Sequence, residues 1–409
     1  MSFVARRLAA FSTAMILLAT SQGSAFAQKK YDAGATDTEI KIGNIMPYSG
    51  PASAYGMIGR IEAAYFNKIN AEGGINGRKI TFISYDDAYS PPKAVEQAIK
   101  LVELDDVLLI FQSVGTPSNT AIQKYMNERG VPQLFVGSGA TKWNDPQHFP
   151  WTMGLQPNYQ SEARIYAKYI LREKPNAKIA VLYQNDDYGK DYLKGLKDGL
   201  GDKAASMIVA EDAYDVTEAT VDSHVVRMKA LNADVFVNIA TSKFAAQAIK
   251  KAAEIGWKPL QFLNNVAASV GVVMKPAGLE ASQGIISSAY LKDPTDPQWE
   301  DYPDMKAWDQ FLDEYYPDAD RADSLVVYAY MEAQALEHVL KACGDNLTRG
   351  NVMKQAASIK DLELGGLLPG IKLNTSATNF APISQLQLAR FKGETWERFG
   401  DIVSADVGE

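Results

Sequence analysis

The sequence predicts an α/β protein whose chain forms two doubly wound lobes on parallel sheets. Short apolar runs bounded by turn residues alternate with helical patterns, which is typical of parallel strands covered on both faces. The alternation occurs twice, and the second series begins near Trp151. Without a predicted leader of 27 residues, the 409-residue chain keeps 382 residues, enough for two or three domains of about 150 residues each.

The first unit is a strand, a tight loop, a helix and a return strand. Residues 40–46 form an apolar run that Pro47-Tyr48-Ser49-Gly50-Pro51 interrupts, and a helical pattern starts near Ala52. A second strand is expected at 80–85, which completes a βαβ unit. The loop after the first strand then lies at the carboxyl edge of the sheet, where open α/β folds bind ligands.

The rest of the chain continues the alternation and ends in a hairpin. Further strands are expected at 107–111, 133–136, 178–183, 207–210, 234–239, 261–263 and 284–289. Helices are expected at 92–104, 117–128, 159–172, 190–199, 221–231, 244–255, 299–315, 323–343 and 351–359. After Gly366 the pattern is β-like, with a short run at 371–373 and a hairpin of 384–391 and 395–399. Two lobes joined by several crossings form a hinged clamp.

The N-terminus has the three parts of a secretory signal peptide. Arg6 and Arg7 supply positive charge, residues 8–19 are mostly apolar, and Ala25-Phe26-Ala27 fits a cleavage site. The apolar run is shorter than the roughly 18 residues that span a membrane. We therefore expect residues 1–27 to be removed and the mature chain to begin at Gln28.

Cysteine usage and charge indicate the compartment and exclude some partners. Cys343 is the only cysteine, so no internal disulfide can form, and none lies near the cleavage site to carry a lipid. A soluble periplasmic protein is expected, with full secretion as the alternative. The formal charge of −8 becomes −10 when Arg6 and Arg7 are removed, which gives no electrostatic reason to bind nucleic acid or anionic lipid.

Several segments, in order along the chain, carry a family resemblance. They are Ile42-Gly43 with Pro47–Pro51, Tyr55-Gly56, Ile69–Gly77, Tyr85-Asp86-Asp87, Gly137–Thr141, Asp186–Gly189 and Ile255-Gly256-Trp257 before Phe262. Together they resemble the leucine/isoleucine/valine-type periplasmic binding proteins of ABC importers.

The resemblance implies a Venus-flytrap fold of type I, with three crossovers, that closes on a small ligand and delivers it to membrane permease subunits. Lobe 1 is expected to hold 37–154 plus 287–365, and lobe 2 to hold 155–286 plus 366–409. We expect the protein to act as a monomer.

A candidate anion site lies where the strand at 107–111 leads into the next helix. Thr116 is a suitable N-cap and Pro117 suits the first helical position. Free backbone N–H groups at such a helix start favour an anion. Alternatively, Thr116 is only a cap and Thr141 only a turn residue. The resemblance implies that a ligand carboxylate binds at Ser113, Gly115, Thr116, Ala140 and Thr141.

Aromatic residues are the second group of candidates. Tyr55 follows the first loop and Tyr188 lies at a helix start in the other lobe, where the resemblance implies that residues wall the ligand. Aromatic faces supply a large apolar contact with few rotamers to restrict. Alternatively, Tyr188 packs between the lobes. Tyr89 and Trp143 are weaker candidates.

One departure from the family bears on the ligand. Amino-acid binders of the family place a glutamate for the ligand ammonium where Val266 stands here, and the neighbouring Asn264 and Asn265 are uncharged. A buried ammonium without a carboxylate costs several kcal/mol, whereas neutral amides suit a hydroxyl or carbonyl. We therefore expect a carboxylate ligand without an α-ammonium group, such as a benzoate or hydroxycinnamate. The alternative is leucine, isoleucine, valine or another amino acid or amide, with Asp186 or Asp187 reaching the ammonium.

An enzyme is not expected. The three histidines, His148, His224 and His338, show no metal or triad spacing. The sequence has no Gly-x-Ser-x-Gly, phosphate loop or His-Glu-x-x-His motif, and one cysteine with scattered histidines does not suit zinc. We expect neither metal nor cofactor. A sensory ligand-binding protein remains a remote alternative that shares the fold.

Overall fold

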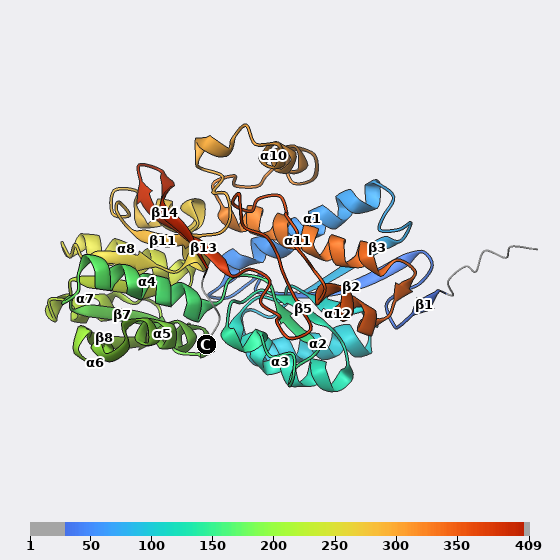
Figure 1. Cartoon of the computed structure of the whole chain (residues 1–409), viewed down its shortest axis with the longest axis horizontal. Helices are drawn as coiled ribbons and strands as arrows, with labels where there is room; N and C mark the ends of the chain where they lie inside the picture. Colours follow the sequence, from blue (N-terminus) through green and yellow to red (C-terminus); the bar gives the residue numbers. More distant parts are fainter. Residues whose placement is uncertain (1–28, 405–409) are drawn as a thin grey trace, which may run out of the picture.

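Two α/β lobes make up the computed structural model, which describes residues 29–404 (Figure 1). The predicted signal peptide, residues 1–27, lies outside the described residues. The two-lobed fold with parallel sheets that the sequence predicted is confirmed. Within residues 29–404, no helix is both long and apolar enough to cross a membrane.

The first lobe contains a five-stranded parallel sheet in the order β3-β2-β4-β5-β6. Alternate side chains of β4 face opposite sides, so Phe111 packs in the cluster of α1 and Ile110 in the cluster of α2. The strands are β2 (Glu39–Met46), β3 (Lys79–Asp86), β4 (Leu109–Phe111), β5 (Gln133–Val136) and β6 (Thr152–Gly154). The helices are α1 (Gly56–Ala71), α2 (Pro91–Glu103) and α3 (Thr116–Arg129).

The second lobe contains a seven-stranded sheet in the order β14-β13-β11-β10-β9-β7-β8. Its strands are parallel except that β13 runs antiparallel to both β11 and β14. The strands are β7 (Ile179–Gln184), β8 (Ile208–Tyr214), β9 (Val235–Ile239), β10 (Leu260–Leu263), β11 (Ile286–Ala289), β13 (Gln385–Lys392) and β14 (Thr395–Ser404). The helices are α4 (Tyr159–Glu173), α5 (Asp187–Leu200), α7 (Asp222–Ala230) and α8 (Ser242–Glu254).

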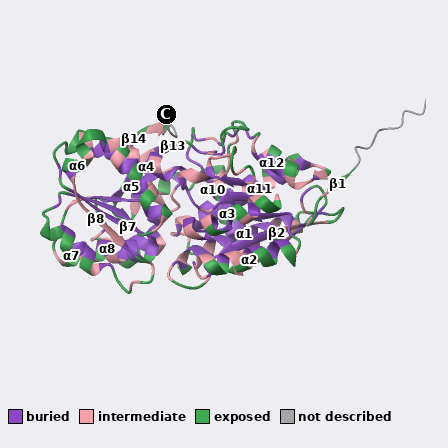
Figure 2. Cartoon of the chain, turned by 90° about the horizontal axis from the view of Figure 1, so that it is seen from below, coloured by how far each residue is buried: buried purple, intermediate pink, exposed green. Residues whose placement is uncertain are grey.

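The two faces of this sheet carry separate cores. Val181 of β7 packs in the cluster of α4 and α5, whereas Leu182 packs in the cluster of α7 and α8. This alternation follows from the two-residue period of a strand. Figure 2 shows the resulting buried strands between partly exposed helices.

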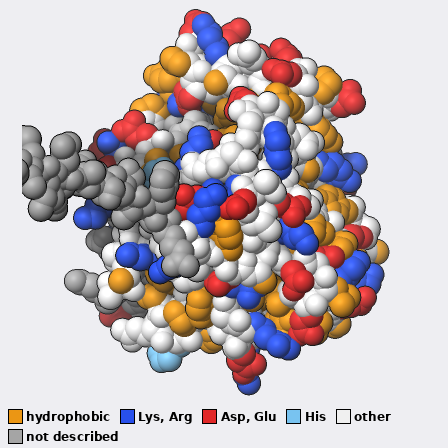
Figure 3. Space-filling model, turned by 90° about the vertical axis from the view of Figure 1, so that its right-hand side faces the viewer, with side chains coloured by type: hydrophobic (Ala, Val, Ile, Leu, Met, Phe, Trp, Pro, Cys, Tyr) orange, Lys and Arg blue, Asp and Glu red, His pale blue; other side chains and the backbone are white. Residues whose placement is uncertain are grey.

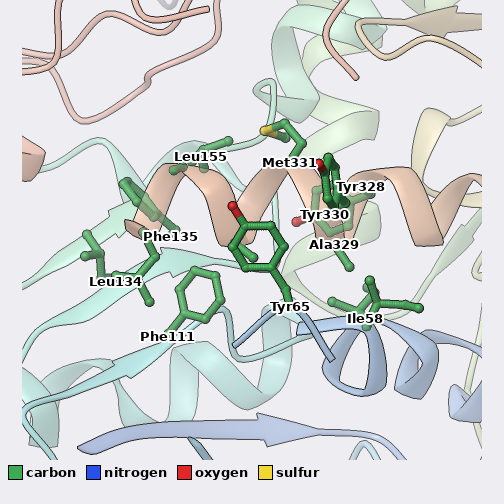
Figure 4. Close-up of a cluster of buried hydrophobic side chains, with 14 of the residues drawn as sticks. Ile58, Tyr65, Phe111, Leu134, Phe135, Leu155, Tyr328, Ala329, Tyr330 and Met331 are labelled. Atoms are coloured by element: carbon green, nitrogen blue, oxygen red, sulfur yellow. The ribbon is translucent and has the colours of Figure 1, made fainter. Parts of the chain in front are cut away.

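The C-terminal third returns to the first lobe through α10 (Pro303–Tyr315), α11 (Ser324–Cys343) and α12 (Arg349–Ala356). The buried helix α11 shares the first-lobe core with α1, and Figure 4 shows Ile58 and Tyr65 of α1 facing its residues Tyr328 to Met331. A short parallel pair, β1 (Lys30–Tyr31) with β12 (Asn346–Leu347), ties the start of the described chain to this region. Short helices cover Ser53–Tyr55, Thr141–Trp143, Gly201–Lys203, Ala204–Met207, Asn265–Ala267, Val270–Met274, Lys275–Ala277 and Pro297–Trp299.

The chain crosses between the lobes three times. It leaves the first sheet after β6 and enters α4, returns after β11, and crosses again just before β13. Neither lobe is therefore a continuous piece of the chain, and the three connections together form a hinge.

Three expectations about segments need correction. The expected return to lobe 1 at residue 287 falls inside β11, which pairs with β10 and β13, so the second sheet extends to Ala289. Residues 366–383 were expected in lobe 2, but Leu368, Leu373 and Phe380 pack in the first-lobe core. Residues 371–373 form no strand, because Leu373 makes only an isolated bridge with Leu362.

The strand β6 had not been predicted. Its three residues, Thr152–Gly154, are too few to show a period, and they pair with β5 only because the sheet is already in place.

On the face shown in Figure 3, lysine and arginine side chains are interspersed with aspartate and glutamate. This mixture on one end of the molecule agrees with the absence of a basic segment in the sequence.

Candidate ligand-binding cleft

A cavity of about 90 Å³ lies between the lobes, at the carboxyl edges of both sheets. Open α/β folds place ligands at this edge, because the loops that follow the strands converge there. Its lining residues come from both lobes and from the hinge. They are Tyr55, Ile58, Tyr89, Val114, Gly115, Thr116, Gly137, Gln156, Tyr159, Tyr188, Thr241, Asn265, Val266, Tyr290, Leu291, Ser324, Leu325 and Tyr328.

The first-lobe wall is the start of α3. Gly115 is the N-cap with φ of 104°, and no side chain caps this helix end. A Cβ added at Gly115 would lie 2.5 Å from the Tyr89 ring, so glycine is needed both for the backbone and for the close approach. The Thr116 and Ser138 hydroxyls hydrogen-bond each other at 2.7 Å. The positive end of the helix dipole thus faces the cavity.

Six tyrosines surround the cavity and make it both aromatic and rich in hydroxyl groups. Burial raises the pKa of each of them, to about 12 for Tyr55, so all six are neutral phenols near neutral pH. The Tyr159 ring meets Tyr188 edge to face at 5.3 Å and stacks on Tyr192 at 4.5 Å. The six are Tyr55, Tyr89, Tyr159, Tyr188, Tyr290 and Tyr328.

Contacts between the lobes close this cavity. The Tyr55 hydroxyl donates to the Val266 carbonyl at 3.0 Å and accepts from the Ser242 N–H at 3.2 Å. The Tyr89 hydroxyl accepts from Gln184 Nε2 at 3.2 Å. First-lobe tyrosines therefore hydrogen-bond to second-lobe residues, which identifies the conformation as closed.

The second-lobe wall is the segment after β10, and a buried glutamate holds it. Glu162 Oε1 accepts from the Asn265 backbone N–H at 2.8 Å, and Oε2 accepts from Asn265 Nδ2 at 2.7 Å. The hydroxyls of Tyr166 and Tyr192 also donate to this carboxylate. Burial raises the pKa of Glu162 to about 6, and these donors offset part of that effect.

Two further buried carboxyl groups lie one helical turn beyond lining residues of the first lobe. Glu62 follows Ile58 on α1, and Glu332 follows Tyr328 on α11. Burial raises the pKa of both well above the usual range, and the proximity of Glu332 adds to the shift of Glu62. Neither Glu332 oxygen makes a well-formed hydrogen bond, and Tyr328 is the neighbouring hydroxyl that offsets part of the effect.

Comparisons with known proteins agree with this geometry. The family described as periplasmic binding protein matches residues 39–395. The chain belongs to this family. The Leu/Ile/Val-binding protein homolog 7 of Brucella abortus (strain 2308) is 25% identical over 384 residues, which cover 89% of this chain and 91% of that protein.

Two solved structures share the fold of this periplasmic binding protein. A fatty acid ABC transporter substrate-binding protein from Thermomonospora curvata has a TM-score of 0.77 and 21% identity, covering 93% of this chain and 96% of that one. A solute binding protein of an ABC transporter from R. palustris, in complex with benzoate, has a TM-score of 0.75 and 21% identity, covering 90% and 98%. Family membership identifies the chain as a solute-binding protein and confirms that it is not an enzyme.

Five of the nine predicted site residues of this periplasmic binding protein line the cavity, and four do not. The lining residues are Tyr55, Gly115, Thr116, Tyr188 and Asn265. Each of the other four binds protein groups. The Ser113 hydroxyl donates to Asn119, the Ala140 N–H to Ser138, the Thr141 hydroxyl to Asp191, and the Asn264 amide to the carbonyls of Asn238 and Ala240.

Charged side chains are absent among the described residues that line the cavity. Asp186 caps α5 by accepting from the Tyr188 N–H at 2.9 Å, and Asp187 pairs with Lys142 at 3.0 Å. Neither aspartate lines the cavity, so neither is placed to meet a ligand ammonium. Across residues 29–404, no group of three or more His, Cys, Asp or Glu could hold a metal ion.

Sequence reasoning missed several lining residues. Tyr290 directly follows β11, so the rule that located the other loops at the carboxyl edge could have found it. Tyr159 and Tyr328 have no such signal, because they reach the cavity through the hinge and through the return of α11. Glu162 lies inside a helix and is recognisable only from its partners.

Proposed function

We propose that this periplasmic binding protein captures a small carboxylic acid without an α-ammonium group, an aromatic acid such as a benzoate or hydroxycinnamate. The observation that carries the proposal is a cavity with a helix N-terminus on one wall, six tyrosines around it, and no charged lining residue among those described. Such a site offers donors to an anion and apolar faces to a ring, but no carboxylate to an ammonium.

The carboxylate of the ligand binds at the start of α3. The first-turn N–H groups lack a capping side chain, and Pro117 occupies the second helical position without an N–H to satisfy. A helix N-terminus stabilises an anion by about 0.3–1 kcal/mol at exposed sites and up to about 2 kcal/mol where it is buried. Burial of the cavity between the lobes favours the upper value.

The ring of the ligand packs among the tyrosines. Edge and face contacts between aromatic rings contribute about 0.5–1.5 kcal/mol beyond the area they bury. The R. palustris protein of the same fold was solved with benzoate, and the T. curvata protein is named for fatty acids. Benzoate and fatty acids are both acids without an amino group, which supports a ligand of that class. The compact cavity favours an aromatic acid over a fatty acid.

The alternative is an amino acid, which the name of the Brucella relative favours. Its ammonium would need a partner, and the buried carboxylate that holds the second-lobe wall, Glu162, already accepts from Asn265 and two tyrosines. An unpaired buried ammonium costs several kcal/mol. The contacts of Glu162 therefore support the acid over the amino acid.

Delivery follows from the closed clamp and the predicted signal peptide. The mature protein acts in the periplasm as a monomer that presents its closed lobes to the permease subunits of an ABC importer. Ligand binding stabilises the closed form because the cavity takes residues from both lobes.

Calorimetric titration with benzoate, p-coumarate, leucine and phenylalanine tests the ligand class. We expect binding of the two aromatic acids and no heat with the two amino acids. Tight binding of leucine without a response to either acid would establish the amino-acid alternative and overturn the proposal.

A further inference from the structure

The side-chain amide of Asn265 has a defined orientation. Four donors converge on Glu162, namely the Asn265 N–H, its Nδ2, and the hydroxyls of Tyr166 and Tyr192. An ionised carboxylate accepts hydrogen bonds and cannot donate them. Asn265 must therefore turn its NH₂ group, and not its oxygen, toward Glu162.

The other end of this amide is the Oδ1 acceptor. Asn265 is half-buried and lines both this cavity and a smaller neighbouring pocket, and no residue among 29–404 donates a hydrogen bond to its Oδ1. A ligand group that meets this oxygen has to carry an O–H or N–H donor. Glu162 thus acts as a positioning residue that sets the polarity of Asn265 without touching the cavity itself.

A second polar group on the same wall is unpartnered. The Tyr188 hydroxyl is fully buried and has no hydrogen-bond partner among the described residues, although Tyr188 lines the cavity. Its ring meets Tyr192 edge to face at 5.6 Å, and Tyr192 donates to Glu162. Tyr188 thus packs against a residue that holds Glu162, and both Tyr188 and Asn265 line the same cavity. A buried hydroxyl without a hydrogen-bond partner is destabilising, so a ligand group that pairs with it is favoured.

We propose that Asn265 and Tyr188 form a subsite for a hydroxyl group of the ligand. A hydroxyl donates to Asn265 Oδ1 and exchanges a second hydrogen bond with the Tyr188 hydroxyl, which satisfies both groups. This inference rests on the proposed function, with the carboxylate at the start of α3 on the opposite wall. The ligand is then an aromatic acid with its hydroxyl at the far end of the ring, as in 4-hydroxybenzoate or p-coumarate.

The wild-type protein and a series of acids test the subsite. Dissociation constants are measured by calorimetry for benzoate, 4-hydroxybenzoate and 4-methoxybenzoate, and for the same three substituents on cinnamate. We expect the hydroxylated acid to bind at least tenfold more tightly than the other two in one of the series. The methoxy group keeps the acceptor oxygen and removes the donor but adds a methyl, whereas benzoate lacks the whole group and is smaller. Weaker binding of both therefore points to the hydrogen bond to Asn265 and not to size alone.

Failure of the subsite and failure of the proposed function give different results. Binding of the acids without a preference for the hydroxylated ones overturns the subsite and leaves the function standing. If no acid in either series binds, both are overturned.

A matched pair of variants tests the role of Glu162. In Glu162→Gln the new amide can accept or donate, so Asn265 is free to reverse its own amide. We expect the preference for hydroxyl over methoxy to fall below threefold, an effect on a ratio that a general loss of stability does not produce. Glu173→Gln, at the exposed end of the same helix, should keep the wild-type ratio. A folded Glu162→Gln protein with an unchanged ratio would refute the positioning role of Glu162. If this variant does not fold, the series of acids measured on the wild-type protein still tests the subsite.

Discussion

The two walls of the cleft contain buried carboxyl groups in opposite states. On the second-lobe wall, Glu162 accepts from four donors, and burial raises its pKa only to about 6. Beneath the first-lobe wall, Glu332 lacks a well-formed hydrogen bond, and burial raises its pKa well above the usual range. Equal burial therefore yields an ionised, position-setting group in one lobe and a neutral acid in the other, and the number of donors makes the difference.

The largest expected effect is on stability after removal of the second-lobe carboxylate. In Glu162→Ala, four buried donors lose their acceptor, and we expect the free energy of unfolding to fall by about 3 kcal/mol. Urea denaturation followed by circular dichroism measures it. Glu173→Ala, on the exposed end of α4, should change stability by less than about 0.5 kcal/mol. A loss below 1 kcal/mol at Glu162 would mean that the four hydrogen bonds contribute little.

The first-lobe wall should respond most strongly at Gly115. In Gly115→Ala, the new methyl group meets the Tyr89 ring and the backbone is strained at φ of 104°, so we expect affinity for the aromatic acid to fall by about 30-fold, or about 2 kcal/mol. Gly350→Ala is the control, because nothing lies within 4 Å of its added Cβ. Unchanged affinity in Gly115→Ala would show that the start of α3 does not contact the ligand.

The raised pKa of Glu162 predicts a dependence of stability on pH. The folded value of about 6 lies above the ordinary value of 4.5, so the folded protein holds the proton more tightly. The stabilisation that comes from this tighter proton binding by Glu162 is present in full below pH 4.5 and is lost as the pH rises through 6. The 1.5-unit difference predicts that wild type loses about 2 kcal/mol more than Glu162→Gln between pH 4.5 and 7.5.

Denaturation curves of both proteins at the two pH values measure this difference. Asp293 and Asp323, whose pKa values burial also raises to about 6, remain in both proteins, so their contributions cancel. Parallel pH profiles for the two proteins would show that Glu162 does not titrate between pH 4.5 and 7.5.

A smaller effect is expected where the walls meet. Tyr55→Phe removes the hydrogen bonds to Val266 and Ser242 that join the lobes but keeps the ring, so we expect about fivefold weaker ligand binding, or about 1 kcal/mol, with little change in stability. Titration calorimetry and thermal melts measure the two quantities separately. Tyr125→Phe, on an exposed hydroxyl outside the cavity, should bind as the wild type does. Wild-type affinity in Tyr55→Phe would show that the hydrogen bonds of the Tyr55 hydroxyl between the lobes do not contribute to ligand binding.

The smallest effect is expected at Glu332. Because this acid is neutral in the folded protein, Glu332→Gln replaces one neutral group with another of similar size, and we expect stability near neutral pH to be unchanged or higher. Urea denaturation at pH 7.5 measures it beside Glu162→Gln. A loss comparable to that at Glu162 would contradict the contrast between the walls.

The fold could be predicted from local patterns, because alternating apolar runs located the strands. The family resemblance, and not these patterns, suggested Tyr55, Gly115, Thr116, Tyr188 and Asn265, and these five residues line the cavity. Local chemistry does not say which way a hydroxyl turns, so Thr141 was expected at the ligand although it donates to Asp191.

Residues that reach the site through the global course of the chain left no such signal. Tyr328 reaches the cavity only because α11 returns to the first lobe. Residues 366–383 pack in the first-lobe core for the same reason, so their place also depends on the path of the whole chain. The orienting role of Glu162 depends on two other segments, α5 and the turn after β10, which meet α4 only in the folded lobe.

The three crossings between the lobes also determine when each core can form. The first-lobe core includes Leu336 of α11, which follows Ile58 of α1 by more than 270 residues, and the second sheet is completed only by β13 and β14. Contacts so distant in sequence fold slowly, and neither lobe is finished until almost the whole chain has been synthesised. A chain truncated before residue 366 would therefore lack part of both hydrophobic cores.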